Sequence, residues 1–256
     1  MPSTLSSPAA ADRGAGLPTF ADIEAAAERL AGHAVVTPLL RNAQLDARLG
    51  ARVLVKPETL QRTGSFKFRG AFNKISRLAA GPERPAAIVA YSSGNHAQGV
   101  AAAAEIAGIP AVIVMPGDAP AIKVANTRSY GAEVVLYDRR TEQREVIAAK
   151  IAAERGAVIV PPYDDPDIIA GQGTAGREIA LQAREMGLAP DLLLIPCSGG
   201  GLVAGSALAI EALSPGTEVY AVEPDGFDDL RRSLEAGSRV ANERPSGSVC
   251  DALLAR

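Results

Sequence analysis

Aromatic residues and histidines are scarce in this chain of 256 residues. It has no tryptophan, aromatic residues make up 4% of it, and the two histidines are His33 and His96. Few aromatic rings count against a surface on which nucleic-acid bases stack. A net charge of -3 offers no basic surplus for phosphate backbones, and two histidines are too few for a histidine-rich metal centre. We therefore expect no nucleic-acid partner.

The sequence has only two cysteines, and its first residues lack the features of a secretory signal. Cys197 and Cys250 lie far apart and form neither a CxxC pair nor a metal-binding spacing, which suggests a reducing compartment. Residues 1–19 are rich in Ala, Ser, Pro and Gly and lack the basic start and apolar stretch of a secretory signal. We expect a flexible N-terminal tail over 1–19 and a cytoplasmic protein.

One apolar run, residues 191–210, has the length of a membrane span. Pro196 and the three glycines at 199–201 divide it into a short strand, a loop and a helix of small residues. This pattern fits a buried βα unit better than a membrane helix. We therefore expect no contact with a membrane.

Strand-like and helical patterns alternate along the chain, and 47% of its residues are hydrophobic. Helical spacing occurs at 20–30, 43–49, 72–78, 95–107, 120–129, 141–155, 174–186 and 202–213, and strand-like runs at 52–56, 87–91, 111–115, 133–137, 157–160, 192–195 and 218–222. This alternation predicts an α/β protein with two open parallel sheets covered by helices. Turns at 79–85 and 161–166 suggest a large domain of 20–83 and 161–256 and a small domain of 84–160.

A lysine marks the first of three loops that suggest chemistry. Lys67 lies in the segment Gly64-Ser65-Phe66-Lys67-Phe68-Arg69-Gly70, between a strand-like run and a helical pattern. A helix N-terminus is unfavourable for a cation, so an ordinary solvated lysine is poorly placed here. A neutral amine bonded to a carbonyl carbon as a Schiff base suits the position better.

The other two loops suit anions. Ser92-Ser93-Gly94-Asn95-His96 opens a helix and offers hydroxyls, an amide and free backbone N–H groups to a carboxylate, although Ser and Asn are also common helix caps. In Ser198-Gly199-Gly200-Gly201-Leu202, consecutive glycines allow several N–H groups to point at one phosphate. No Gly-Lys-Ser/Thr follows, so this is not a Walker A loop. A tight strand-to-helix turn is the other interpretation, but such a turn usually needs one glycine and not three.

Two further motifs are weaker. Residues 171–176 match GxGxxG, but a Pro- and Asp-rich turn precedes them where a dinucleotide site requires a buried strand. We interpret them as a loop leading into a helix. Residues 223–229 hold four carboxylates, which fit a surface turn. Such oxygens could also bind a hard cation such as Mg²⁺, Ca²⁺ or K⁺.

A lysine at a helix start, a carboxylate loop and a phosphate loop together describe a site for pyridoxal 5'-phosphate and an amino acid. In this order, residues 63–71, 92–96 and 198–202 resemble the motifs of fold-type II pyridoxal-phosphate enzymes, in the threonine/serine dehydratase and serine racemase branch. Cysteine and threonine synthases have related lysine motifs, with Asp where Phe68 stands. The resemblance implies a tryptophan synthase beta-like fold.

The same resemblance implies roles for individual residues. Lys67 would be the Schiff-base lysine and would move the Cα proton, with Phe66 and Asn95 on the cofactor. The cofactor phosphate would be bound by Ser198, where the family usually has Gly, and by Gly199, Gly200, Gly201 and Leu202. The substrate carboxylate would be bound by Ser92, Ser93, Gly94 and His96, and Arg144 would close over the substrate. In the racemase, the serine that matches Ser93 is also the acid/base on the opposite face.

Two implications concern the C-terminal third. Glu223, Asp229 and the carbonyl of Phe227 match a divalent-cation site. Family members continue beyond the position of Leu254 and supply there a Ser or Cys for the pyridine nitrogen. The resemblance therefore implies that the C-terminal part is missing, because neither Ser248 nor Cys250 stands where that partner belongs.

The resemblance implies a lyase that converts a small hydroxy amino acid, L-threonine or L-serine, to a 2-oxo acid and ammonia, as a homodimer. Three alternatives stay open. One is serine racemase, and another is a hydroxy-amino-acid dehydratase of compatible-solute (hydroxyectoine) catabolism. The third is a truncated, non-catalytic paralogue that binds the cofactor.

Overall fold

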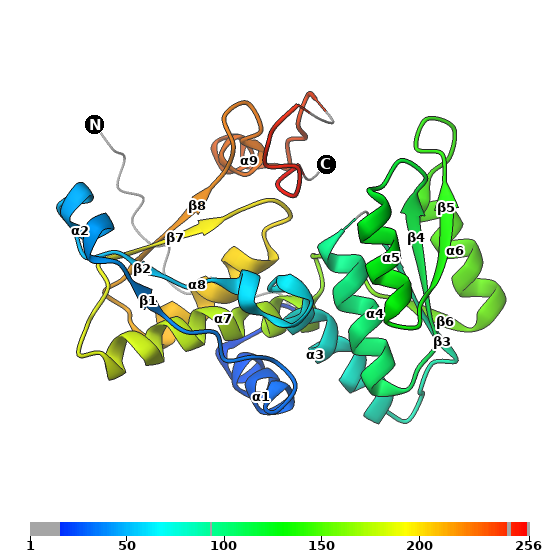
Figure 1. Ribbon diagram of the computed structural model, residues 1–256, viewed down its shortest axis with the longest axis horizontal. Coiled ribbons are helices and arrows are strands. Elements are labelled where there is room, and N and C mark those ends of the chain that lie inside the picture. The colour runs from blue at the N-terminus through cyan, green and yellow to red at the C-terminus, as the bar shows by residue number, and fades with distance from the viewer. Residues whose placement is uncertain (1–15, 93, 245–246, 255–256) are drawn as a thin grey trace.

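The computed structural model describes residues 16–92, 94–244 and 247–254. Most of the predicted N-terminal tail therefore lies outside the described residues. The elements form two groups that lie side by side (Figure 1). One group contains a four-stranded parallel sheet, and the other contains two two-stranded sheets, one parallel and one antiparallel. The prediction of an α/β fold with two parallel sheets is confirmed.

The four-stranded sheet has the order β5-β4-β3-β6, and all its pairs are parallel. Its strands are β3 (Ala87–Tyr91), β4 (Ala111–Pro116), β5 (Glu133–Tyr137) and β6 (Ala157–Ile159). The helices between them are α4 (Asn95–Ala107), α5 (Ala121–Ser129) and α6 (Arg144–Arg155). Every strand begins and ends within about a residue of its predicted bounds.

The second group is built around the 20-residue helix α7 (Pro166–Glu185). Helices α1 (Phe20–Leu30), α3 (Lys67–Ala80) and α8 (Gly201–Leu213) contact α7. Strands β7 (Leu192–Pro196) and β8 (Glu218–Val222) form a parallel pair, and β1 (Leu40–Arg41) and β2 (Leu54–Val55) an antiparallel pair. The remaining helices are α2 (Ala43–Leu49) and α9 (Asp229–Ala236), with short 3₁₀ turns at Glu58–Leu60 and Arg62–Gly64. The sequence prediction missed α9.

Capping and spacing explain where two of these helices begin and what they bury. Helix α1 starts with a capping box, in which Thr19 and Asp22 exchange hydrogen bonds, and its apolar residues fall on one buried face. Helix α7 begins at Pro166, directly after its N-cap Asp165, whose side chain accepts from two backbone N–H groups. Both helices thus have ends that the local sequence specifies.

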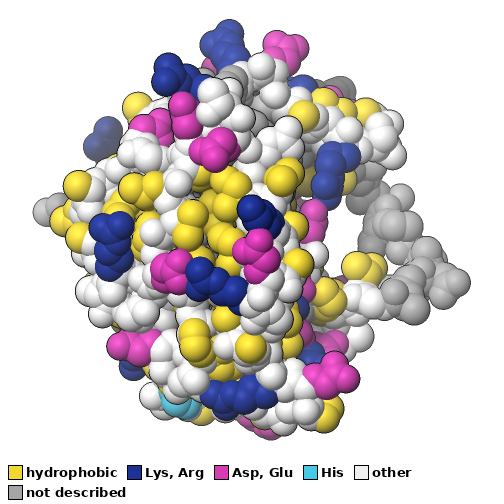
Figure 2. All heavy atoms as spheres, turned by 90° about the vertical axis from the view of Figure 1, so that its right-hand side faces the viewer, with side chains coloured by type: hydrophobic (Ala, Val, Ile, Leu, Met, Phe, Trp, Pro, Cys, Tyr) yellow, Lys and Arg dark blue, Asp and Glu magenta, His cyan; other side chains and the backbone are white. Residues whose placement is uncertain are grey.

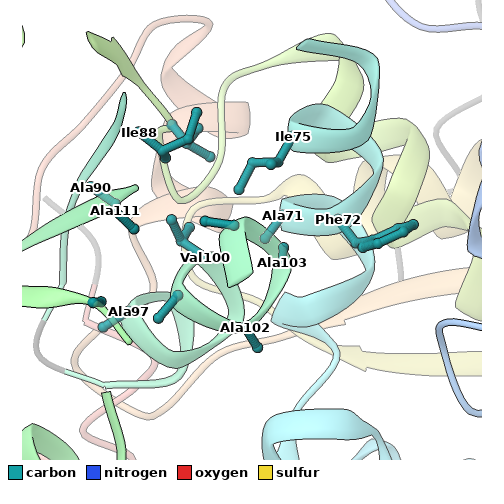
Figure 3. Close-up of a cluster of buried hydrophobic side chains, with 14 of the residues drawn as sticks. Ala71, Phe72, Ile75, Ile88, Ala90, Ala97, Val100, Ala102, Ala103 and Ala111 are labelled. Atoms are coloured by element: carbon teal, nitrogen blue, oxygen red, sulfur yellow. The ribbon is translucent and has the colours of Figure 1, made fainter. Parts of the chain in front are cut away.

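The main core joins the two groups of elements. It lies where α3 packs against α4 and α4 covers β3 and β4 (Figure 3). Alanines predominate on α4, where Ala97, Ala101 and Ala103 are fully buried. Small side chains let α3 approach closely, so the loop before α4 is held near the start of α3.

Glycines allow α7 to cross its neighbours closely. A Cβ atom on Gly171 would lie 2.6 Å from the Cα of Gly70 on α3, and one on Gly176 would lie 2.6 Å from the Cα of Ser206 on α8. Both distances are too short for real atoms. The GxGxxG match at 171–176 therefore lies inside a helix and serves packing, which corrects the interpretation of this stretch as a loop.

A buried charge network fixes the first turn of α3. The Arg69 side chain is 1% exposed, and its guanidinium donates to both carboxylate oxygens of Glu58, at 2.7 and 2.8 Å. It also donates to both oxygens of Glu178 on α7, at 2.7 and 2.9 Å. Burial opposes ionisation of Arg69, but the two carboxylates raise its pKa. The network ties the segment that bears Lys67 to α7.

The surface carries charges of both signs. Figure 2, seen from the side of β5 and α6, shows Lys, Arg, Asp and Glu side chains interspersed with apolar ones. Within residues 16–92, 94–244 and 247–254, no helix is both long and apolar enough to span a membrane.

Candidate active site

Lys67 is the first residue of α3 and is separated from β2 by two 3₁₀ turns. Its Nζ donates to the carbonyl of Pro162 at 2.8 Å and lies 5.3 Å from the centre of the Phe66 ring. Burial lowers the pKa of Lys67 from 10.5 to about 8, because the ammonium loses hydration there. A substantial fraction of this amine is therefore neutral near physiological pH.

Helix α4 presses against the backbone of Lys67. A Cβ atom on Gly99 would lie 3.1 Å from the carbonyl carbon of Lys67 and 3.1 Å from the nitrogen of Phe68. Only a residue without a side chain allows this contact without displacing one of the helices. Gly99 thus sets the distance between Lys67 and the loop that precedes α4.

That loop contains the predicted carboxylate ligands. Gly94 is the N-cap of α4, and its N–H donates to the Ser92 hydroxyl at 3.3 Å. The first hydrogen bond of the helix runs from the Gln98 nitrogen to the Gly94 carbonyl. The N–H groups of the first helical turn therefore precede the helix hydrogen-bond ladder and are available to an anion. Asn95 is exposed, and Ser93 lies outside the described residues.

His96 is buried, and its Nε2 lies 3.0 Å from the carbonyl oxygen of Val160. Burial lowers the pKa of His96 to about 3, and the charge of Lys67 adds to this effect. The ring is thus neutral, with its proton on Nε2 as donor to Val160. Its Nδ1 is buried without a hydrogen-bond partner. In this conformation the His96 side chain has no N–H group left to donate to a carboxylate. Only the backbone N–H of His96 could make the predicted contact with the substrate.

The glycine loop joins β7 to α8. Gly200 has a φ of 78°, a conformation that favours glycine. Ser198 is not among the residues with positive φ in the described chain, so a serine fits where the family usually has Gly. The first hydrogen bond of α8 runs from the Ala204 nitrogen to the Gly200 carbonyl. The N–H groups of Gly201 and Leu202 thus precede the helix ladder.

Residues 160–163, directly after β6, bring the three loops together. The carbonyl of Val160 contacts His96, and the carbonyl of Pro162 accepts from Lys67. The ring of Tyr163 packs on Gly199, where a Cβ atom would lie 2.1 Å from the ring. The amine, the carboxylate loop and the glycine loop therefore surround one place, at the carboxyl ends of β3, β6 and β7.

Arg144 is the first residue of α6. Its guanidinium carbon lies 5.2 Å from the centre of the Tyr91 ring, and its Nε donates to Glu145 at 2.7 Å. Burial opposes its charge, but Glu145 raises the pKa of Arg144, and Tyr137 and Tyr163 act in the same direction. Arg144 thus lies near the segment that joins the three loops. Its closing over a substrate stays a prediction.

The predicted cation ligands have other partners. The Glu223 carboxylate accepts from the backbone nitrogens of Leu230 and Arg231, at 2.8 and 3.0 Å, and so caps α9. The Asp229 carboxylate accepts from Asn242 at 2.6 Å. In the described part of the chain, no three His, Cys, Asp or Glu side chains are grouped to hold a metal ion. The site at Glu223, Phe227 and Asp229 stays a prediction.

Comparison with known proteins identifies the class. The chain belongs to the family described as pyridoxal-phosphate dependent enzyme, which it matches over residues 30–254.

Three similar proteins narrow the relationship. An L-threo-3-hydroxyaspartate ammonia-lyase of a Pseudomonas species is 51% identical, over 90% of this chain and 70% of that protein. A serine racemase of Schizosaccharomyces pombe is 44% identical, over 90% and 69%. The crystal structure of a threonine deaminase of T.th. superposes with a TM-score of 0.85 at 49% identity, over 92% of this chain and 75% of that one. The predicted fold-type II, tryptophan synthase beta-like fold is confirmed.

The residues of the site fit pyridoxal phosphate. Lys67 offers an amine with a lowered pKa, and the glycine loop offers N–H groups at a helix end for a phosphate. Three buried polar atoms in the lysine motif and the carboxylate loop have no hydrogen-bond partner within the protein, namely Thr63 Oγ1, Ser65 Oγ and His96 Nδ1. Buried polar groups are normally satisfied, so unpartnered atoms in two of the site's motifs suit a polar ligand.

Sequence reasoning missed some residues at this site. Tyr163 and the carbonyl of Pro162 lie in a turn whose sequence, rich in Pro and Asp, indicates a break in the fold and gives no signal of a site. Thr63 and Ser65 belong to the lysine motif itself, and their hydroxyls were the signal available. Lys123 on α5 lies beside Gly94, but an isolated lysine in an amphipathic helix gives no sequence signal.

Proposed function

We propose that this chain is a pyridoxal-phosphate-dependent ammonia-lyase that converts a small hydroxy amino acid to a 2-oxo acid and ammonia. One observation carries the proposal: residues 160–163 contact the Lys67 amine, His96 in the first turn of α4, and the glycine loop. L-threo-3-hydroxyaspartate is the first substrate to test, because the relative at 51% identity bears its name. L-threonine and L-serine, the substrates that the sequence motifs suggest, come next.

Each group of the site has a task in this reaction. When bound, the cofactor supplies an electron sink that stabilises negative charge at the substrate Cα. The glycine loop and the start of α8 would hold its phosphate, with Phe66 and Asn95 beside its ring. The N–H groups at the start of α4 would orient the substrate carboxylate. Lys67, once released from the cofactor, would take the Cα proton, for which a pKa near 8 is well suited.

The test is turnover by purified protein supplied with pyridoxal phosphate. Each amino acid is incubated separately, and both the 2-oxo acid and ammonia are measured. We expect equal amounts of both products, and expect Lys67→Ala to abolish them. Lys150→Ala is the matched control, because Lys150 is 75% exposed on α6 and pairs only loosely with Glu154, at 3.9 Å. Unchanged activity in Lys67→Ala would contradict the proposed role.

Racemisation is the second candidate, favoured by the similarity to a serine racemase. The same incubations therefore include an assay for D-serine formed from L-serine. D-serine without ammonia would replace the lyase proposal with a racemase. Cofactor binding without either product would favour a non-catalytic binder. Whether two chains form a homodimer is measured by sedimentation of the same preparation.

A further inference from the structure

Lys123 places an ammonium group at the start of α4. It is the third residue of α5, a helix that contacts α4. A Cβ atom on Gly94 would lie 3.5 Å from the Nζ of Lys123 and 3.6 Å from its Cδ. The lysine side chain therefore lies along the loop that we propose as the receptor for the substrate α-carboxylate.

A carboxylate already lies beside this ammonium. Asp251, in the C-terminal segment, has its Oδ2 3.5 Å from the Nζ of Lys123. The Asp251 side chain is 77% exposed and that of Lys123 is 34% exposed. An exposed ion pair of this kind contributes little to stability, so a ligand can displace Asp251 at small cost. The position of Nζ is thus accessible to a carboxylate that approaches from outside.

The start of α4 does not need Lys123 in order to bind one carboxylate. The N–H groups of Asn95, His96 and Ala97 precede the first helix hydrogen bond, and the helix dipole adds positive potential there. Lys123 adds a full charge at the same end. A substrate with a single carboxylate can be bound by the N–H groups alone, which leaves the ammonium of Lys123 available to a second carboxylate.

We propose that Lys123 binds the second carboxylate, on Cβ, of a dicarboxylic hydroxy amino acid and so sets substrate preference. The inference rests on the proposed function and deepens it. A β-carboxylate pairs with the ammonium. The methyl group of threonine and the hydrogen of serine leave it without a new partner. Threonine and serine leave the ammonium with Asp251, whereas a dicarboxylic substrate gains a charge-assisted hydrogen bond to Lys123, and this gain is the source of the discrimination.

The experiment compares substrates in Lys123→Gln. We expect kcat/KM for L-threo-3-hydroxyaspartate to fall about 10- to 100-fold, and kcat/KM for L-threonine to change by less than about threefold. Lys150→Gln is the matched control and should change neither value. Lys123→Arg keeps the charge and should retain part of the preference. Equal losses for both substrates would show that Lys123 acts on the α-carboxylate or on the fold, and would overturn the inference.

Binding measurements separate this inference from the proposed function. With cofactor-loaded protein, the visible spectrum is titrated with L-aspartate and with L-alanine, which lack the leaving hydroxyl. Lys123→Gln should weaken L-aspartate binding at least about tenfold and leave L-alanine binding unchanged.

Calorimetry of cofactor-free protein with succinate and with propionate makes the same comparison without the cofactor. In this measurement, Lys123→Gln should weaken the binding of succinate and leave that of propionate unchanged. Wild-type binding of succinate no tighter than that of propionate would refute the inference, whether or not the protein turns over any substrate.

Asp251→Asn provides an independent check. Removing the competing carboxylate should lower the KM for L-threo-3-hydroxyaspartate and leave that for L-threonine unchanged. A higher KM for the dicarboxylic substrate would show that Asp251 supports the site rather than competes for it, and would count against the inference.

Discussion

The lowered pKa of Lys67 makes a quantitative prediction about its reactivity. Burial moves this pKa from 10.5 to about 8. At pH 7.5, about a quarter of the amine is then neutral, against about 0.1% for a lysine with the ordinary value. Since only the neutral amine is nucleophilic, the rate at which Lys67 reacts should rise with pH and reach half its maximum at about pH 8.

Competitive labelling of the cofactor-free protein measures this directly. Limiting acetic anhydride is added from about pH 6 to about pH 11, together with a small amine as internal standard, and the peptide that contains Lys67 is quantified by mass spectrometry. We expect its labelling curve to lie about 2.5 pH units below that of an ordinary lysine. A midpoint near 10.5 would show that the amine is well hydrated and would refute the assigned environment.

The same burial has a consequence for stability. Because the pKa of Lys67 is lower in the folded chain than in the unfolded chain, folding is penalised while the amine is protonated, and stability rises with pH between about 8 and 10.5. Lys67→Met removes this penalty. The cofactor-free variant should be more stable than the wild type at pH 7, by about 1–3 kcal/mol. Denaturant unfolding at pH 7 checks this, and a less stable variant would contradict it.

Two further predictions concern packing. Arg69→Met leaves the carboxylates of Glu58 and Glu178 without their main partner in a buried place, and should lower the free energy of unfolding by about 3–5 kcal/mol; a loss below about 1 kcal/mol would contradict the network. Gly171→Ala forces α3 and α7 apart and should cost more than about 2 kcal/mol, whereas Gly216→Ala, with open space around it, should cost little. Equal unfolding free energies for these two glycine variants would refute the close crossing.

Much of the fold follows from local sequence. The strands of the four-stranded sheet are continuous apolar runs bounded by turns, so their bounds were predictable from pattern alone. Helix α1 has a capping box and one apolar face. The three site loops were recognisable because glycines, serines and a lysine stood at strand and helix ends. Two of these loops follow strands of parallel sheets, and ligands gather at the carboxyl ends of such strands.

Other features depend on contacts that local sequence does not encode. Glycines disfavour a helix, so residues 171–176 suggested a loop, and only the fit of Gly171 against Gly70 explains why α7 continues through them. Helix α9 was missed because the segment just before it, with its carboxylates, proline and glycine, indicated a surface turn, and because the carboxylate that caps α9, Glu223, lies outside the helix. His96 suggested a carboxylate ligand, but burial against Val160 makes its ring neutral. The place of Lys123 depends on how α5 packs on α4.

The most direct test of the account is the covalent link between Lys67 and the cofactor. Purified protein is incubated with pyridoxal phosphate, reduced with borohydride and digested, and the peptides are analysed by mass spectrometry. We expect one reduced cofactor adduct, on Lys67, and none in Lys67→Ala. An adduct on another lysine, or no adduct in the wild type, would contradict it.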